Sequence, residues 1–270
     1  MNKKKISILI TNFNKEKFIE ECILSCLSQN YNNLEIIIVD NSSTDKSMSI
    51  IKKYSNELLI VKKKRESLYS PKNQIDSLIE AFKKSTGNLI LLLDGDDYFL
   101  PNKVSHIKDI FLKDNNLDVV FDVPKILSNN KFTRLKIKKK YNKNIWPTTI
   151  PTSGISFKRV FFENCLEFDL FDSYPTLEID FRLNFFAQRI QRKFLTIKED
   201  LTIYRKVNDG IMSKVNFFSY NWWLKRLQAH YFIIEAYKKN EIEYKKNYDF
   251  YLTKITVWFL NKSYIYHREK

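Results

Sequence analysis

The chain has 270 residues and a formal net charge of +15, and 44% of its residues are hydrophobic and 29% charged. This mixture is typical of a globular protein, the length allows one large domain or a domain with an appended segment, and no apolar run is long enough to cross a bilayer. The charge would suit an anionic partner, but the basic runs at 3–5, 62–65 and 136–143 lie apart and no nucleic-acid-binding motif accompanies them, so we expect no nucleic-acid partner.

The chain begins with a basic head and a short apolar run that polar residues soon interrupt. No cleavage-site pattern of small residues follows, so this start does not indicate a secretory signal. The three cysteines, Cys22, Cys26 and Cys165, are an odd number, and Cys22 and Cys26 lie four residues apart on a predicted apolar helix face, which favours buried free thiols there. We therefore expect a cytoplasmic protein, with peripheral attachment to the inner face of a membrane as the alternative.

Strand and helix patterns alternate through the first hundred residues. Short apolar runs predict buried strands at 6–10, 34–40, 57–61 and 88–93. Helical patterns follow each of them, and Ser42 with Asp45 resembles a capping box that would open the second helix. Apolar strands that alternate with helices predict an α/β fold with a mostly parallel sheet covered on both faces. Ligands bind such sheets beyond the carboxyl ends of the strands.

The second half is less regular. A helix after Pro101 and a strand at 117–122 precede a basic, irregular stretch that runs to about residue 147. A loop, strand and helix follow, then a helix at 178–190 and strand-like runs within 194–206. From residue 215 onward the chain is aromatic and basic, lacks Gly and Pro, and predicts helices. We therefore divide the chain into a main domain, 1–214, and a C-terminal helical extension, 215–270.

The segment "LLLDGDD" places three carboxylates at the end of a predicted buried strand. Asp94 and Asp96 offer the oxygen ligands that Mg²⁺ or Mn²⁺ takes, and such ions are usually completed by water and substrate phosphates. Gly95 removes a side chain where something must approach the backbone. The alternative is an ordinary solvated turn, and we interpret Asp97 as a helix cap.

Two further strand and helix ends carry polar residues. Asp40 ends a buried strand, where its carboxylate could accept hydrogen bonds from a base or sugar, although an Asx turn is the simpler interpretation. Lys72 and Asn73 open a predicted helix, so they could face a diphosphate, although ordinary capping would also place them there. Their occurrence in order at successive ends favours a shared ligand site.

Residues 6 to 103 resemble the family 2 glycosyltransferases, and a fainter resemblance extends to about residue 213. The matching features are an S-x-x-x-Q-x-Y segment, an aspartate-terminated strand followed by S-T-D, and a glycine-led strand that ends in D-x-D-D. The family positions are occupied here by Ser25, Gln29, Tyr31, Asp40, Ser43, Thr44, Asp45, Asn73, Ala81, Gly87, Asp94, Asp96 and Asp97. Lys72 stands where the family usually has arginine.

The resemblance implies a GT-A (Rossmann-like) domain and an inverting sugar transfer from a nucleotide-diphosphate donor, with a UDP-sugar favoured, to an acceptor hydroxyl of a surface polysaccharide or lipopolysaccharide. It implies a Mn²⁺ or Mg²⁺ cofactor, with Asp96 as direct ligand and Asp94 at the ribose or the metal. The remaining donor contacts that it implies are Thr11 and Phe13 in the nucleotide pocket, Asp40 at the base, Lys72 and Asn73 near the ribose and diphosphate, and Gly95 in the metal loop.

An inverting displacement also needs a base opposite the leaving group. By register with the family's acidic pair we assign Asp180, while Glu178 and Asp200 remain alternatives and a plain helix-terminus role for the acids is the other interpretation. Many relatives carry a histidine shortly after "YR", and this chain has none there, so Asn208 or Asp209 would have to replace it.

Three other function classes stay open at this point. A catalytically impaired module that binds sugar nucleotides or glycans would fit the altered acidic pair. A related nucleotidyltransferase is disfavoured because "TNFNKEKF" has no glycine. A nucleic-acid binder has only the charge in its favour. The aromatic and basic extension could pack on the main domain, form a homodimer, or lie at a membrane that holds a lipid-linked acceptor.

Overall fold

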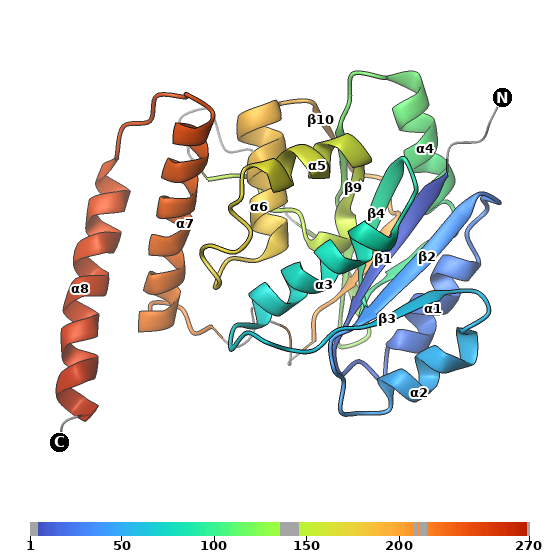
Figure 1. The fold of residues 1–270 in the computed structure, drawn as a ribbon, viewed down its shortest axis with the longest axis horizontal. Helices are drawn as coiled ribbons and strands as arrows, with labels where there is room; N and C mark the ends of the chain where they lie inside the picture. Colours follow the sequence, from blue (N-terminus) through green and yellow to red (C-terminus); the bar gives the residue numbers. More distant parts are fainter. Residues whose placement is uncertain (1–4, 136–145, 208–209, 211–214, 269–270) are drawn as a thin grey trace.

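The computed structural model describes residues 5–135, 146–207, 210 and 215–268, with side chains up to residue 261. A seven-stranded sheet lies at its centre, helices cover both faces, and two long helices stand at one side (Figure 1). The predicted α/β fold, with a mostly parallel sheet and C-terminal helices, is confirmed.

The four predicted strands of the first half lie together in the sheet. The order of strands is β10-β6-β9-β4-β1-β2-β3, and only β9 runs antiparallel to its neighbours. The strands are β1 (Ile6–Asn12), β2 (Leu34–Asp40), β3 (Leu59–Lys62), β4 (Leu89–Asp94), β6 (Val119–Asp122), β9 (Ile155–Lys158) and β10 (Phe194–Ile197). Crossover helices join β1, β2, β3 and β4, and the carboxyl ends of these strands meet at one edge.

Successive side chains of each strand enter opposite layers of the core, because a strand alternates its side chains between faces. Ile8 packs with one set of helices and Leu9 with the other. The first set is α1 (Ile19–Leu27), α2 (Ser47–Ile51), which continues as the short η1 (Lys52–Tyr54), and α4 (Lys103–Lys113). The second is α3 (Ser70–Lys84), α5 (Arg159–Glu167) and α6 (Ile179–Phe185), which continues as the π-helical η3 (Phe186–Gln191).

A second, four-stranded sheet lies beside the first, in the order β5-β11-β7-β8. Its strands are β5 (Tyr98–Phe99), β11 (Thr202–Arg205), β7 (Lys125–Ser128) and β8 (Lys131–Arg134). The sequence predicted irregular structure for the segment that forms the β7–β8 hairpin. The strand-like runs in 194–206 are confirmed as β10 and β11.

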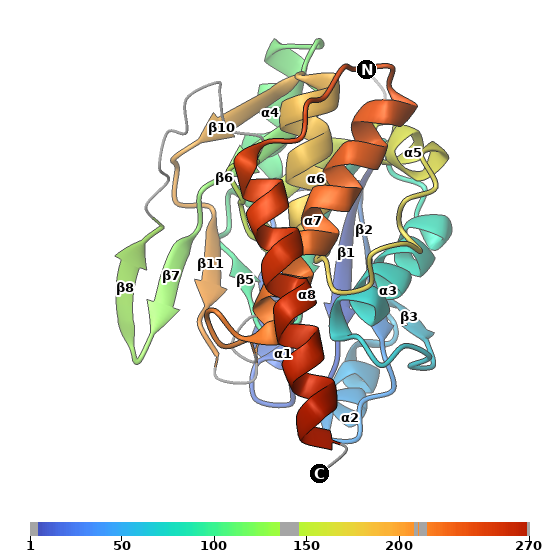
Figure 2. The same ribbon diagram turned by 90° about the vertical axis from the view of Figure 1, so that its left-hand side faces the viewer.

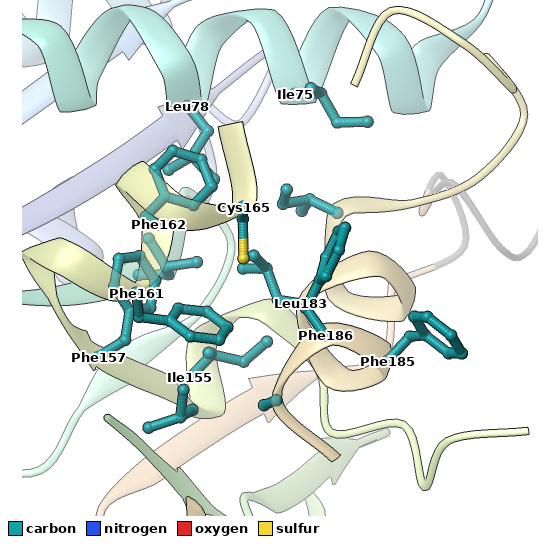
Figure 3. Packing of buried hydrophobic residues seen from close by; sticks show 14 of the residues in the cluster. Ile75, Leu78, Ile155, Phe157, Phe161, Phe162, Cys165, Leu183, Phe185 and Phe186 are labelled. Carbon is teal, nitrogen blue, oxygen red and sulfur yellow. The ribbon is translucent and has the colours of Figure 1, made fainter. Parts of the chain in front are cut away.

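The layer between the sheet and α3 is rich in phenylalanine rings (Figure 3). The C-terminal helix α7 (Tyr220–Lys239) completes this layer, since Phe232 lies 5.6 Å from the ring of Phe185 and 5.8 Å from that of Phe186. Helix α8 (Tyr248–Arg268) packs against α7, and Figure 2 shows the two helices side by side. In the described part of the chain, no helix has the length and hydropathy needed to cross a membrane.

Two local predictions have clear outcomes. The capping box at Ser42 and Asp45 is wrong, because α2 begins only at Ser47 and the Ser42 hydroxyl donates to the Lys63 carbonyl instead. Cys22 and Cys26 are buried free thiols, as expected, and Cys165 is one as well. One ion pair lies wholly inside the protein: the Lys103 ammonium contacts the Asp122 carboxylate, and both side chains are fully buried.

Candidate functional site

Neighbouring strand ends bring the predicted donor-binding residues together. The parallel register sets Thr11 of β1 opposite Asp94 of β4, and Asn12 opposite Asp40 of β2. The Thr11 hydroxyl donates to Asp94 over 3.0 Å, and the Asn12 amide donates to Asp40 over 2.8 Å. The polar ends of three strands therefore form one continuous hydrogen-bonded edge.

Asp40 is 2% exposed and is held by its own turn. Its carboxylate accepts bonds from the Ser43 amide at 3.0 Å and from the Ser43 hydroxyl at 2.6 Å, besides the bond from Asn12. A carboxylate has about four acceptor positions, so one is left for an outside donor. Both interpretations of Asp40, the Asx-type turn and the ligand contact, are compatible with this geometry.

An arginine covers the aromatic ring that the resemblance assigns to the nucleotide pocket. The Arg65 guanidinium lies 3.9 Å from the ring centroid of Phe13, and it donates to the Asn41 side chain over 3.0 Å. Phe13 remains 36% exposed. A guanidinium stacked on an aromatic face provides a flat, cationic surface with unused donors.

The side chains at the start of α3 differ in their contacts. Lys72 contacts Asp76, and its ammonium lies 2.9 Å from Asp172; although partial burial opposes the charge, these carboxylates raise the pKa of Lys72. Asn73 is buried, and its amide binds the backbone of the preceding loop, residues 66–69. Gln74, which the sequence reasoning missed, donates to Asp94 over 2.7 Å.

Asp94 and Asp96 lie close enough to perturb each other. Burial and the charge of Asp96 raise the pKa of Asp94 to about 6, while the bonds from Thr11 and Gln74 and the nearby Lys15 oppose that rise. The Lys15 ammonium lies 2.8 Å from the Asp96 carboxylate, and both side chains are mostly buried. A lysine from the loop after β1 thus supplies positive charge to the acidic turn.

The donor set fits a hard divalent cation of the type completed by substrate. The described residues contain no cluster of three or more His, Cys, Asp or Glu side chains that could hold a metal. The Asp94 and Asp96 carboxylates together supply oxygen ligands that suit Mg²⁺ or Mn²⁺, and such ions need only one or two carboxylates when water and phosphate oxygens supply the rest. The mutual repulsion of the two carboxylates is what such a cation would relieve.

The acidic turn, residues 94–97, packs against the end of β1 and against residues far along the chain. A Cβ on Gly95 would lie 2.7 Å from the Asn12 side-chain oxygen, so glycine is required by the neighbouring strand end. Asp97 caps no helix, contrary to our interpretation, because α4 begins at Lys103. Its buried carboxylate instead accepts a 2.5 Å bond from Ser153 and a 2.7 Å bond from the Arg205 backbone amide.

Asp180 stands in the first turn of α6, partly buried, and accepts a 2.6 Å bond from the Phe181 amide. Burial and the charge of Glu178 raise the pKa of Asp180 to about 7, and the ammonium of Lys225 opposes that rise. Lys225 lies on α7 and forms an ion pair with Glu178. The C-terminal extension therefore contributes a charge next to the candidate base.

Asp200, the candidate base from the later acidic pair, lies in a different environment. Asp200 precedes β11, and its carboxylate lies 2.7 Å from Lys125 and 3.2 Å from Arg134, both on the second sheet. These cations lower the pKa of Asp200. Asn208 and Asp209, the expected replacements for the missing histidine, lie outside the described residues.

Sequence reasoning missed four residues of this region: Lys15, Arg65, Gln74 and Lys225. Only the position of Lys15, directly after a strand end, hinted at a role.

Comparison with known proteins gives a consistent result. The family model described as "Glycosyl transferase family 2" matches residues 7–166, more than half of the chain. An Escherichia coli protein named UDP-Glc:alpha-D-GlcNAc-diphosphoundecaprenol beta-1,3-glucosyltransferase WfaP is 37% identical over 101 residues, 37% of this chain and 39% of that protein. A Methanococcus voltae protein named dolichyl N-acetyl-alpha-D-glucosaminyl phosphate 3-beta-D-2,3-diacetamido-2,3-dideoxy-beta-D-glucuronosyltransferase is 27% identical over 221 residues, 75% of this chain and 64% of that protein.

A similar fold occurs in the crystal structure of Staphylococcus aureus TarS 1–349 in complex with UDP-GlcNAc. The TM-score is 0.62 at 16% identity, over 95% of this chain and 71% of that one, so the likeness is one of fold. The matched segments span about half to two thirds of the length of three curated relatives.

Proposed function

The chain belongs to glycosyl transferase family 2, and from that premise we propose that it transfers a sugar, with inversion, from a nucleoside diphosphate donor to a hydroxyl of a glycan acceptor. We favour a UDP-sugar as donor and a surface polysaccharide or lipopolysaccharide as the product. The relatives support this choice, since the names of two of them specify sugar transfer to lipid-linked acceptors and TarS was crystallised with UDP-GlcNAc.

One observation carries the proposal: the carboxylates of Asp94 and Asp96 share an edge with Thr11 and Asp40, and Asp180, at the start of α6, is near enough for the charge of Asp94 to contribute to its raised pKa. Asp180 is the carboxyl whose pKa rises to about 7, which suits a group that must accept a proton near neutral pH. Two acidic groups in distinct environments are what donor binding and proton removal require.

Each residue then has a defined task. Phe13 and Arg65 form a flat surface for the base, and the free acceptor position of Asp40 receives a bond from it. Asp94 and Asp96 would hold Mn²⁺ or Mg²⁺, which supplies charge neutralisation to a departing diphosphate. Lys15 and Lys72 add positive charge beside the diphosphate. Asp180 takes the proton from the acceptor hydroxyl as that oxygen attacks the anomeric carbon and the bond to the diphosphate breaks.

The experiment is a screen of UDP- and GDP-sugars with Mn²⁺, read as thermal stabilisation and as release of nucleoside diphosphate. We expect Asp96→Ala to lose the metal-dependent stabilisation. Asp180→Asn should keep donor binding and lose turnover, whereas the matched control Asp200→Asn should keep both. Full turnover in Asp180→Asn would show that the base is another residue.

The strongest competing function is a catalytically impaired module that binds the donor without transferring sugar. The split acidic pair, Glu178 and Asp180, favours it because the family usually has adjacent acids. The same screen separates the two functions. Donor-dependent stabilisation without diphosphate release, for every donor and acceptor tried and in the unmodified chain, would favour the binding module.

A further inference from the structure

Helix α8 carries an exposed apolar stripe between Tyr248 and Phe259. The side chains of the stripe are 42% to 80% exposed, and they are Tyr248, Tyr251, Leu252, Ile255, Trp258 and Phe259. Their spacing of three and four residues places them on one side of the helix. Phe250 and Thr253, on the opposite side, are buried toward α7. Helix α8 is therefore apolar both where it packs and where it faces outward.

A second exposed aromatic group precedes α7. Phe217 and Phe218 are 73% and 66% exposed, and their rings lie 5.0 Å and 5.3 Å from that of Trp222. The Tyr220 hydroxyl donates to Asn261 of α8 over 3.5 Å, so the start of α7 and the later half of α8 meet (Figure 1). We call Phe217, Phe218, Trp258 and Phe259 the aromatic surface.

The start of α7 links the aromatic surface to the candidate site. Lys225, in the second turn of α7, binds Glu178 at the start of α6, two residues before the candidate base Asp180. The end of the helical pair that bears the aromatic surface is therefore also the end whose Lys225 contacts Glu178, next to the candidate base.

The charge of this region favours one kind of occupant. Residues 215–270 contain ten Lys and Arg but only five Asp and Glu. Three of those acids, Glu235, Glu243 and Asp249, already pair with neighbouring cations. A second copy would bring like charge against like charge. Anionic lipid headgroups attract Lys and Arg, and Trp, Tyr and Phe rings bury well at the level of the headgroups.

We propose that the aromatic surface and the stripe on α8 bind an anionic lipid bilayer, which presents a lipid-linked acceptor to the adjacent site. The acceptor part rests on the proposed function, but the lipid binding does not. Vesicle binding needs no donor and no turnover, so a failure of either idea is visible separately.

The test is flotation of the full chain with vesicles of phosphatidylcholine alone or of phosphatidylcholine mixed with phosphatidylglycerol. We expect binding to the mixed vesicles that weakens as salt is raised, because salt screens the attraction. Trp258→Ser with Phe259→Ser should weaken binding about tenfold or more, because two exposed aromatic rings would no longer bury among the lipid headgroups. The same should hold for Phe217→Ser with Phe218→Ser.

The matched control replaces Leu112 and Phe132 with serine, because these exposed apolar residues lie on α4 and β8, away from the helical pair. This variant should bind vesicles like the unmodified chain. The thermal unfolding midpoint of each variant, measured without ligand, reports whether it is folded. The proposal is wrong if the unmodified chain does not float, or if the aromatic variants float as well as the control. It is equally wrong if light scattering shows a dimer that those same substitutions dissociate.

Discussion

The pH dependence of sugar transfer is the most direct test of Asp180. Its pKa is raised from 3.8 to about 7 by burial and by Glu178. If the ionised form is required, kcat/KM should be about one tenth of its plateau at pH 6, about half at pH 7 and about nine tenths at pH 8. A carboxylate with an ordinary pKa would instead give a flat profile above pH 5. The assay is the initial rate of diphosphate release in overlapping buffers.

Two neighbouring charges allow the midpoint to be moved in opposite directions. Glu178→Gln removes the negative charge that raises the pKa of Asp180, so the midpoint should fall below 7. Lys225→Met removes the opposing positive charge, so the midpoint should rise above 7. A flat profile in the unmodified enzyme, or identical midpoints in the two variants, would refute the assignment of Asp180 as base.

The raised pKa of Asp180 also makes the stability of the fold depend on pH. The pKa of Asp180 in the folded state lies above its unfolded value of about 3.8, so protonation favours the folded state. The contribution of this group is therefore fully present below about pH 4 and is lost as the pH rises through 7. Asp180→Asn should remove this loss, and the stability difference between the two proteins should change with pH in that window.

Three further predictions concern Asp96, Gly95 and Lys103, and they can be measured by ligand binding or by denaturation. Asp96→Asn should weaken Mn²⁺-dependent UDP binding, seen by calorimetry, and unchanged binding would remove Asp96 from the site. Gly95→Ala should destabilise the fold by about 1–3 kcal/mol in urea, because its Cβ would meet the Asn12 side chain at 2.7 Å. Lys103→Met should lower the free energy of unfolding by about 3–5 kcal/mol, because it leaves the buried Asp122 carboxylate unpaired. Adding Asp122→Leu should restore much of that loss. No recovery would argue against the ion pair as the cause.

The sheet and the convergence of its polar strand ends could be predicted because they depend on short-range signals. A short, continuous apolar run such as Leu89–Leu93 between polar segments favours a buried strand, and parallel strands place their ends together whatever their loops contain. The convergence of Thr11, Asp40 and Asp94 follows from that rule. The second sheet gave no comparable signal, since β7 and β8 are half-buried or exposed and carry no clean alternation.

The missed residues depend on contacts between distant segments. Lys225 reaches Glu178 across 47 residues, and Ser153 reaches Asp97 across 56. Nothing in the local sequence distinguishes Lys225 from the many solvated lysines of this basic chain. Asp97 was misassigned for the same reason, because its partners, Ser153 and Arg205, come from later elements that meet it only in the fold.

The packing of α7 also has a consequence for how the chain is made. Phe185 and Phe186 are covered by Phe232 and Ala236, which a ribosome adds some fifty residues later. At a synthesis rate of about 5–20 residues per second, Phe185 and Phe186 remain exposed for about 3–10 s before Phe232 and Ala236 are added. A group of phenylalanines exposed for that time is a natural target for a chaperone. Synthesis that stalls before α7 should therefore yield an aggregating nascent chain rather than a smaller folded enzyme.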